Sequence, residues 1–224
     1  MGILERKERE REQRRSAIVD AAEKVFFEKG IDSATMDEIA DVAELSKGTL
    51  YLYFKSKTEL YLAVCEKGMN IMLDQFRMAY EQPVSGREKL RQIGFTYFNF
   101  AITHPDYFKA SSYFELTDMD HEAKDSEIAI ACHGIGEQLF SYTLEAIYAG
   151  MRDGSIHEGH NPNELAVMMW SSMRGVIQLY NMRHRGHEIP ILNNLSFEDL
   201  VPHYVNLLLE GLRYAPVEDA VRTS

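Results

Sequence analysis

The chain has 224 residues, of which 45% are hydrophobic and 26% charged, a composition and length typical of a globular protein with a sizeable core. No apolar run approaches the ~18 residues that a membrane span needs, and the charged N-terminus does not resemble a secretory signal. Two cysteines are too few for a disulfide framework and suit a reducing compartment, so we expect a cytoplasmic protein.

The net charge of −11 is unevenly distributed along the chain. Residues 1–57 hold 11 Lys and Arg against 12 Asp and Glu, whereas the remaining 167 residues hold 13 against 23. The acidity therefore belongs to the second part of the chain, and a nearly neutral first part can still present a basic face. The charge balance permits nucleic-acid binding without arguing for it.

Residues 5–15 carry a dense mixture of both charge signs, with glutamates placed four residues before arginines. This order supports a helix. The segment is predicted either to extend the first helix as a solvated surface or to form an arm whose arginines contact DNA phosphates or the minor groove. Apolar residues at helical spacing between Ile18 and Phe26 then form the inner face of the first helix, and Gly30 ends it.

Residues 35–57 read TMDEIADVAELSKGTLYLYFKSK and predict two short helices and the start of a third. Thr35 and Glu38 form a capping box at the start of the first helix, which we expect to end near Ala43. Ser46 is the N-cap of the second helix, and a further capping box opens the third. Two helices joined by a short turn, the second with Lys, Thr and Tyr facing outward, are typical of a helix-turn-helix.

The second helix of a helix-turn-helix lies in the major groove of double-stranded DNA, so its outward residues are candidate contacts. Lys47 can donate to guanine or to a phosphate, and Gly48 allows the backbone to approach closely. Tyr51 is long enough for a base or the sugar edge, and Thr35 lies at a helix start, where phosphates bind well. The predicted DNA contacts are Thr35, Lys47, Gly48, Thr49, Tyr51, Tyr53 and Lys57.

The run T-x-x-x-I-A-x-x-A-x-L-S-K-G-T-L-Y-x-Y-F-x-S-K resembles the DNA-binding domain of the TetR family of bacterial transcriptional regulators, over roughly residues 14–62. The resemblance implies that the seven positions just named contact DNA. It also implies a homodimer that represses from a palindromic operator until a hydrophobic or aromatic small molecule releases it. Two residues depart from the family pattern: Glu44 stands where glycine is common, and Asp37 places a carboxylate near phosphates.

Capping and stop signals predict further helices along the rest of the chain, at about residues 56–80, 85–103, 106–116, 122–152, 162–184 and 196–214. No segment alternates apolar and polar residues as a strand does. We therefore expect an all-α protein of about nine helices. An N-terminal three-helix helix-turn-helix domain is predicted in residues 1–56, followed by a helical ligand-binding and dimerisation domain in residues 57–224.

Between residues 95 and 114 lie eight of the chain's 24 aromatic residues, which comprise 11 Phe, 12 Tyr and 1 Trp. Aromatic and methionine side chains adapt to varied ligand shapes, so this cluster predicts a pocket for an apolar or aromatic small molecule. Each residue taken alone is more typical of core packing. The predicted lining residues are Phe95, Phe98, Tyr113, Phe114, Trp170 and Met173.

The last two predicted helices carry apolar residues at helical spacing, and Ser171, Ser172 and Gly175 would allow a second helix to approach closely. One recognition helix covers only a few base pairs, whereas two held about 34–36 Å apart contact both halves of a palindrome. A homodimer is therefore predicted. The predicted interface residues are Leu165, Met169, Val176, Leu200, Tyr204 and Leu208.

Signals for other chemistry are weak. Two His-x-x-His pairs, at residues 157–160 and 184–187, lie in predicted loops or helix ends without a nearby cysteine, so we expect no metal. Catalytic and nucleotide-binding motifs are missing, so we expect neither an enzyme nor a cofactor. The alternative that remains is a helical small-molecule-binding or adaptor protein without specific DNA binding, which Glu44, Asp37 and the net acidity favour.

Overall fold

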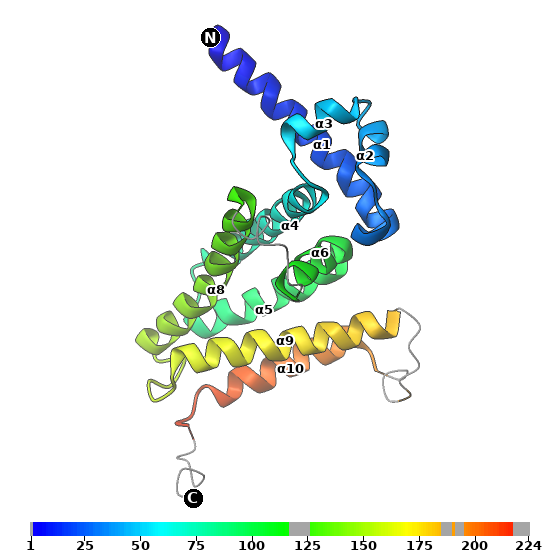
Figure 1. The fold of residues 1–224 in the computed structure, drawn as a ribbon. Helices are drawn as coiled ribbons and strands as arrows, with labels where there is room; N and C mark the ends of the chain where they lie inside the picture. The colour runs from blue at the N-terminus through cyan, green and yellow to red at the C-terminus, as the bar shows by residue number, and fades with distance from the viewer. Residues whose placement is uncertain (1, 117–125, 185–189, 191–194, 217–224) are drawn as a thin grey trace, which may run out of the picture. The chain divides into compact units, whose positions relative to one another are not determined.

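The structure is a computed structural model that describes residues 2–116, 126–184, 190 and 195–216. Within these residues no strand occurs, and the predicted all-α class with about nine helices is confirmed. The helices, marked in Figure 1, are α1 (Ile3–Ser33), α2 (Met36–Val42), α3 (Lys47–Tyr53), α4 (Lys57–Tyr80), α5 (Gly86–Thr103), α6 (Pro105–Leu116), α8 (Glu127–Asp153), α9 (Pro162–His184) and α10 (Phe197–Gly211).

The chain divides into two compact units. The first comprises Met1–Ile71 with His104–Gly136, and the second comprises Met72–Thr103 with Glu137–Ser224. The three helices of the predicted helix-turn-helix domain lie in the first unit, together with the first part of α4 and with α6. The domain boundary after residue 56 stays a prediction.

The helix starts around the turn follow the local signals in the sequence. The Thr35 hydroxyl accepts from the Glu38 backbone N–H at 3.3 Å, and the Glu38 carboxylate accepts from the Thr35 N–H at 3.0 Å. Ser46 Oγ accepts from the Thr49 N–H at 3.1 Å and so caps α3. Glu44 takes the left-handed conformation, with a φ of 55°, so the turn holds a side chain where glycine would be less strained.

Other predicted helix ends agree with the structure within a residue or two, except that α1 continues past Gly30 to Ser33 and α10 ends early; the predicted helix start at 122 lies outside the described residues. Gly30 interrupts α1 with a φ of 77°, and Gly154 follows α8 with a φ of 74°. Asn161 caps α9 by accepting backbone N–H bonds through its side-chain oxygen. Helix α10 begins at Phe197, so Pro202 lies in its second turn. Proline has no N–H to donate there, and the helix also ends at 211, earlier than predicted.

The first unit has a core built from α1, α2, α3 and α4. Ile18, Ile39, Leu50 and Phe54 are all fully buried, which confirms the inward faces expected for the first three helices. Phe26 meets the ring of Tyr61 edge to face, with centroids 5.2 Å apart. The buried Leu50 and Phe54 therefore anchor α3 in this core.

In the second unit, α5 and α8 touch through their backbones. A Cβ placed on Gly86 would overlap the backbone nitrogen of Gly150, so only glycine fits there. The Gly86 N–H also donates to the Asp153 carboxylate at 2.7 Å. This contact fixes the beginning of α5 against the end of α8, and α5 in turn carries part of the cavity described below.

Candidate nucleic-acid interface and interior cavity

Helix α3 has one buried and one exposed side. Leu50 is fully buried, whereas Lys47 and Gly48 are exposed at the beginning of the helix. Tyr51 is 42% exposed and Tyr53 is half-buried, so neither ring belongs to the interior. Lys47, Gly48 and Tyr51 are therefore accessible and Tyr53 is partly so, and all four stay predicted DNA contacts.

Lys47 has a partner on α2. Its ammonium lies 2.7 Å from the Asp37 carboxylate, and both side chains are more than half exposed. The hydrogen bond to Asp37 raises the pKa of Lys47 above its ordinary value. Exposed ion pairs of this kind are weak, so a phosphate can replace the carboxylate. Asp37 orients Lys47 at the face, although the carboxylate itself repels phosphate.

Two predicted threonine contacts already make local hydrogen bonds. The Thr35 hydroxyl donates to the Glu38 carboxylate at 3.0 Å within the capping box. The Thr49 hydroxyl lies 2.8 Å from Ser46 Oγ at the beginning of α3. Both threonines stay predicted DNA contacts, and a phosphate would have to share or replace these bonds.

Lys57 has a structural role that the sequence did not reveal. Its ammonium donates to the backbone carbonyl of Ala34 at 2.9 Å and to that of Asp32 at 3.2 Å. These carbonyls end α1, so Lys57 caps that helix and ties it to the beginning of α4. Its contact with DNA stays a prediction, with two of its three N–H donors already used in these bonds.

A polar cluster ties α6 and α4 to α1. The Tyr107 hydroxyl donates to the Glu23 carboxylate at 2.6 Å, and the Lys67 ammonium donates to the same carboxylate at 2.6 Å. Lys67 also bonds Asp20 at 2.7 Å. The Tyr107 ring lies against Gly68, where an added Cβ would come within 2.5 Å of the ring.

The cluster changes the acidity of both its proton donors. Burial, followed by the hydrogen bond to Glu23, raises the pKa of Tyr107 to about 12. Burial alone would lower the pKa of Lys67, but the hydrogen bonds to Asp20 and Glu23 outweigh it and hold that pKa above its ordinary value. The folded chain therefore favours a neutral phenol beside a charged ammonium.

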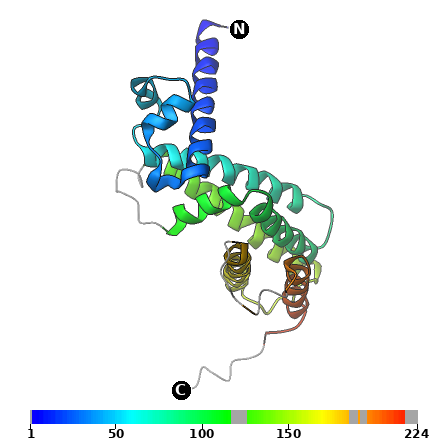
Figure 2. The ribbon, with the colours of Figure 1, turned by 90° about the vertical axis from the view of Figure 1, so that its right-hand side faces the viewer.

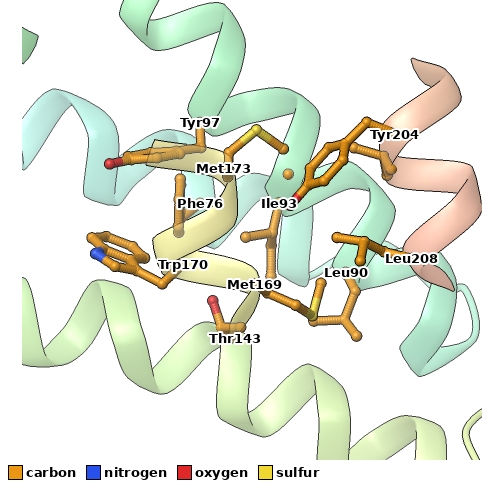
Figure 3. Close-up of a pocket in the computed structure, with 12 residues that line it drawn as sticks. Phe76, Leu90, Ile93, Tyr97, Thr143, Met169, Trp170, Met173, Tyr204 and Leu208 are labelled. Carbon is orange, nitrogen blue, oxygen red and sulfur yellow. The ribbon is translucent and has the colours of Figure 1, made fainter. Parts of the chain in front are cut away.

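The second unit encloses an apolar cavity of about 40 Å³. Figure 3 shows side chains from α4, α5, α8, α9 and α10 converging on it. The rings of Tyr97 and Trp170 stack along its wall, with centroids 5.0 Å apart. Met169 and Met173 also line it, and Gly94 leaves space on the α5 side. The few polar groups at the wall are hydroxyls and the indole N–H, so the site favours an apolar ligand.

Two of the six predicted pocket residues, Trp170 and Met173, line this cavity. Phe95 lines an open groove on another face of α5, and Phe98 packs edge-on against Tyr180. These two therefore do not meet at the cavity, because neighbouring positions on a helix point about 100° apart.

The remaining two predicted pocket residues lie on α6. Phe114 belongs to the first unit, where its ring lies 5.0 Å from that of His133. The side chain of Tyr113 lies outside the described part of the chain. The cavity residues that the sequence reasoning missed on α5 are Leu90, Ile93, Gly94 and Tyr97. Their i, i+3, i+4, i+7 spacing was the available signal.

The predicted dimer residues lie mostly on the inner sides of α9 and α10. Met169, Tyr204 and Leu208 line the cavity, and Leu165 is buried. Val176 and Leu200 are half-buried. The exposed apolar residues of these two helices are instead Val167, Met168, Leu179 and Leu207. Most of the predicted interface residues are thus covered within the chain, and α9 carries apolar residues on both of its sides, so the interface stays a prediction.

Among the described residues, no group of His, Cys, Asp and Glu is arranged to hold a metal ion. The rings of His157 and His160 lie 6.4 Å apart, and His187 lies outside the described residues. In the same part of the chain, no helix combines the length and apolarity needed to cross a bilayer.

Residues 18–64 match the family model described as bacterial regulatory proteins, tetR family. Over 90 residues the chain is 40% identical to the HTH-type transcriptional activator FasR of Mycolicibacterium smegmatis, a match that covers 40% of this chain and 41% of that protein. It is 24% identical over 195 residues to the fatty acid metabolism regulator protein of Bacillus subtilis, covering 82% of this chain and 92% of the relative.

Two solved structures share the fold. The fatty acid degradation regulator FadR of Bacillus halodurans has a TM-score of 0.67 at 21% identity, covering 89% of this chain and 96% of that one. FadR of Bacillus subtilis, in complex with stearoyl-CoA, has a TM-score of 0.68 at 19% identity, covering 88% and 98%.

A buried support beneath an exposed recognition helix, with a helical second unit, defines a DNA-binding transcriptional regulator. The matched residues contain the whole turn and both of its helices. Residues 18–64 thus match the DNA-binding domain of the TetR family of bacterial regulatory proteins.

The Tyr107 pKa generates a prediction for alkaline stability. A pKa near 10 in the unfolded chain and about 12 in the folded one means that the phenol stabilises the fold fully below pH 10. This stabilisation is lost as the pH rises through 12. The Tyr107→Phe variant lacks the group, so its deficit in unfolding free energy should shrink between about pH 10 and 12. Urea unfolding at several pH values measures this, and a constant deficit would contradict it.

Proposed function

We propose that the protein is a homodimeric repressor that binds a palindromic operator in the cytoplasm. An apolar effector with an acyl chain, bound in the cavity of the second unit, releases it from DNA. The observation that carries the proposal is the pairing, in one chain, of an accessible recognition helix with an apolar cavity.

The DNA-binding part of the proposal is supported by Gly48. A Cβ added there would meet only Ser46 Oγ at 3.9 Å, and the backbone does not require glycine because its φ is not positive. Packing within the chain therefore gives no reason for a glycine in α3, where it weakens the helix. A DNA backbone or base edge approaching this position supplies the reason.

The effector part is supported by the wall of the cavity. A volume of about 40 Å³ is enough for a water molecule or two, so an acyl chain enters only if the wall opens. Met169 and Met173 are unbranched and flexible, and they can change rotamer at low cost. The named ligand of FadR from Bacillus subtilis, stearoyl-CoA, and the fatty-acid title of the curated relative favour this ligand class.

A short path along the chain connects the cavity to α1. Ile93, Gly94 and Tyr97 of α5 line the cavity, and a single residue separates the end of α5 from the beginning of α6 at Pro105. Helix α6 carries Tyr107, whose hydroxyl bonds α1. We infer that opening the cavity displaces α5, and that this displacement changes how α1 and the recognition helix are held.

The homodimer is supported by the exposed apolar residues on α9 and α10. Met168 is 61% exposed and Leu207 is 68% exposed, so both apolar side chains are available for a partner to cover. Gly175 lies on the exposed side of α9 and has open space around its missing Cβ, so a partner helix can come close. A second copy covering this face would place two recognition helices on one duplex.

A second candidate, activation of transcription, is favoured by one relative. FasR is named as an activator and is 40% identical over 90 residues. Activation would use the same DNA contacts and differ in the position of the operator relative to the promoter. Transcription in vitro from the upstream promoter separates the two, because added protein lowers the transcript for a repressor and raises it for an activator.

DNA binding is tested with the duplex upstream of the protein's own gene, by fluorescence anisotropy at several salt concentrations. The wild type should bind this duplex more tightly than a scrambled one, with a steep salt dependence. The Lys47→Ala/Tyr51→Ala variant should lose most of this preference. Gly48→Ala should weaken binding at least about tenfold while leaving the fold intact, because alanine favours the helix. Equal, weak binding to both duplexes by the wild type would refute the proposal.

Effector binding is tested through Trp170, the only tryptophan in the chain, because its ring lines the cavity. Stearoyl-CoA should change its fluorescence and release the duplex, whereas coenzyme A alone should do neither. In Gly94→Ala the new methyl group meets Met173 and Val205 at ordinary contact distances of 3.6 and 3.7 Å. This variant should bind DNA normally but bind stearoyl-CoA about tenfold more weakly. An unchanged wild-type signal would exclude this ligand class.

The dimer is tested by placing charge on the exposed face of α9 and α10. Met168→Glu/Leu207→Glu should shift the protein to monomers in sedimentation velocity and weaken operator binding by more than about tenfold, because the two half-sites are then bound separately. Ile130→Glu is the matched control, since Ile130 is an apolar α8 residue with 62% exposure. A wild type that stays monomeric at micromolar concentration would contradict the assembly.

A further inference from the structure

Helix α1 is longer than the support of a recognition helix requires. Its buried stretch begins at Ile18, yet the helix begins at Ile3. In Figure 2 the N-terminal turns of α1 extend beyond α2 and α3. From Leu4 to Arg14 every side chain is exposed. About three turns of helix are therefore exposed to solvent, and burial of apolar side chains does not account for them.

Three cations on this extension share the face of α1 that is buried further along. Lys7, Arg11 and Arg14 precede Ile18 by eleven, seven and four residues, which are the spacings of one helix face. The only non-helical backbone within α1 is at Gly30, so this register is unbroken from Lys7 to Ile18. The cations therefore continue the line of side chains that packs on the helix-turn-helix.

The acidic residues of the extension lie on other faces. Glu5, Glu8 and Glu12 are spaced three and four apart, so they form their own stripe about 130° around the axis from the cations. Glu10 is paired with Arg6 at 2.8 Å. Within the described part of the chain, Lys7, Arg11 and Arg14 form no ion pair. Glu5, Glu8 and Glu12 thus lie apart from the three cations, and Glu10, which is nearer to them, is held by Arg6.

Arg15 shows which side of the domain the basic face is on. Its guanidinium lies over the ring of Phe54, 5.1 Å from the centroid. Phe54 is the C-cap residue of α3, so this face of α1 adjoins the end of the recognition helix. The basic face therefore begins one turn of α1 or less before the point where α1 contacts the C-terminal end of α3.

We propose that Lys7, Arg11 and Arg14 form a basic stripe that binds the backbone phosphates of duplex DNA beside the half-site contacted by α3. Seven residues of helix span about 10 Å, which matches about three base pairs of backbone. Phosphate contacts of this kind add affinity and fix orientation without selecting sequence. The proposal rests on the proposed DNA-binding function and adds a second contact region to it.

The test compares two charge-matched variants of the full chain. Lys7→Gln/Arg11→Gln removes two cations from the stripe, and Arg6→Gln/Arg9→Gln removes two from outside it. Both sets keep good helix formers, and circular dichroism checks that helicity is unchanged. Affinity for the upstream duplex is measured across salt concentrations, with a second duplex trimmed to the half-sites recognised by α3.

The stripe variant should bind the full duplex about tenfold more weakly, and its salt slope should fall by about 0.9 for each phosphate that the protein no longer binds. The control variant should keep the wild-type slope, although it frees Glu10 and is therefore the harsher change. Trimming the flanks should reduce the wild type to the level of the stripe variant. Equal reductions of affinity and salt slope in both variants would contradict the proposal that the stripe binds DNA, and so would an affinity of the wild type that trimming leaves unchanged. Either result would still be compatible with DNA binding by α3. A wild type that binds neither duplex specifically would overturn the proposed function as well.

Discussion

The structure of the DNA-binding face depends on burial of one side of a seven-residue helix. A helix as short as α3 does not persist alone, because nucleation costs more than a few internal hydrogen bonds return. Leu50 and Phe54 hold it by being fully buried, and Arg15 covers the Phe54 ring from α1. Lys47 and Tyr51 are accessible at fixed positions because of this support. The predicted DNA contacts are thus positioned by the buried Leu50 and Phe54.

The position of α1, which supports α3, depends in turn on the polar cluster that joins α1 to α4 and α6. Drawing an ammonium partly out of water is costly unless it is paired, and Lys67 has two carboxylate partners on α1. Tyr107 shares one of them, and the missing side chain at Gly68 lets its ring reach that position. Because three helices meet at Glu23, a shift of any one of them changes bonds made by the others. Such shared bonding agrees with the proposed function, in which a change in α5 reaches α1 through α6.

Local signals in the sequence predicted the helices well, because caps such as Thr35 and Ser46 act within four residues of their partners. The role of Lys57 was missed, since its acceptor carbonyls lie 23 and 25 residues earlier in the chain. The cavity was predicted only in part, because its wall combines five helices and the rotation of each about its axis decides which aromatic residue takes part. The same rotation moved Met169 from the expected interface to the cavity wall.

The small cavity has a thermodynamic consequence for regulation. Under the proposed function, an acyl chain must open this volume of about 40 Å³, so it binds one arrangement of α5, α9 and α10 and is excluded from another. A ligand shifts an equilibrium only by the difference in its affinity for the two arrangements, so a closed cavity makes that difference large. Linkage then requires that operator DNA weaken effector binding by the same factor. The tight packing of Tyr97 on Trp170 is, in this sense, part of the regulatory device as well as of the core.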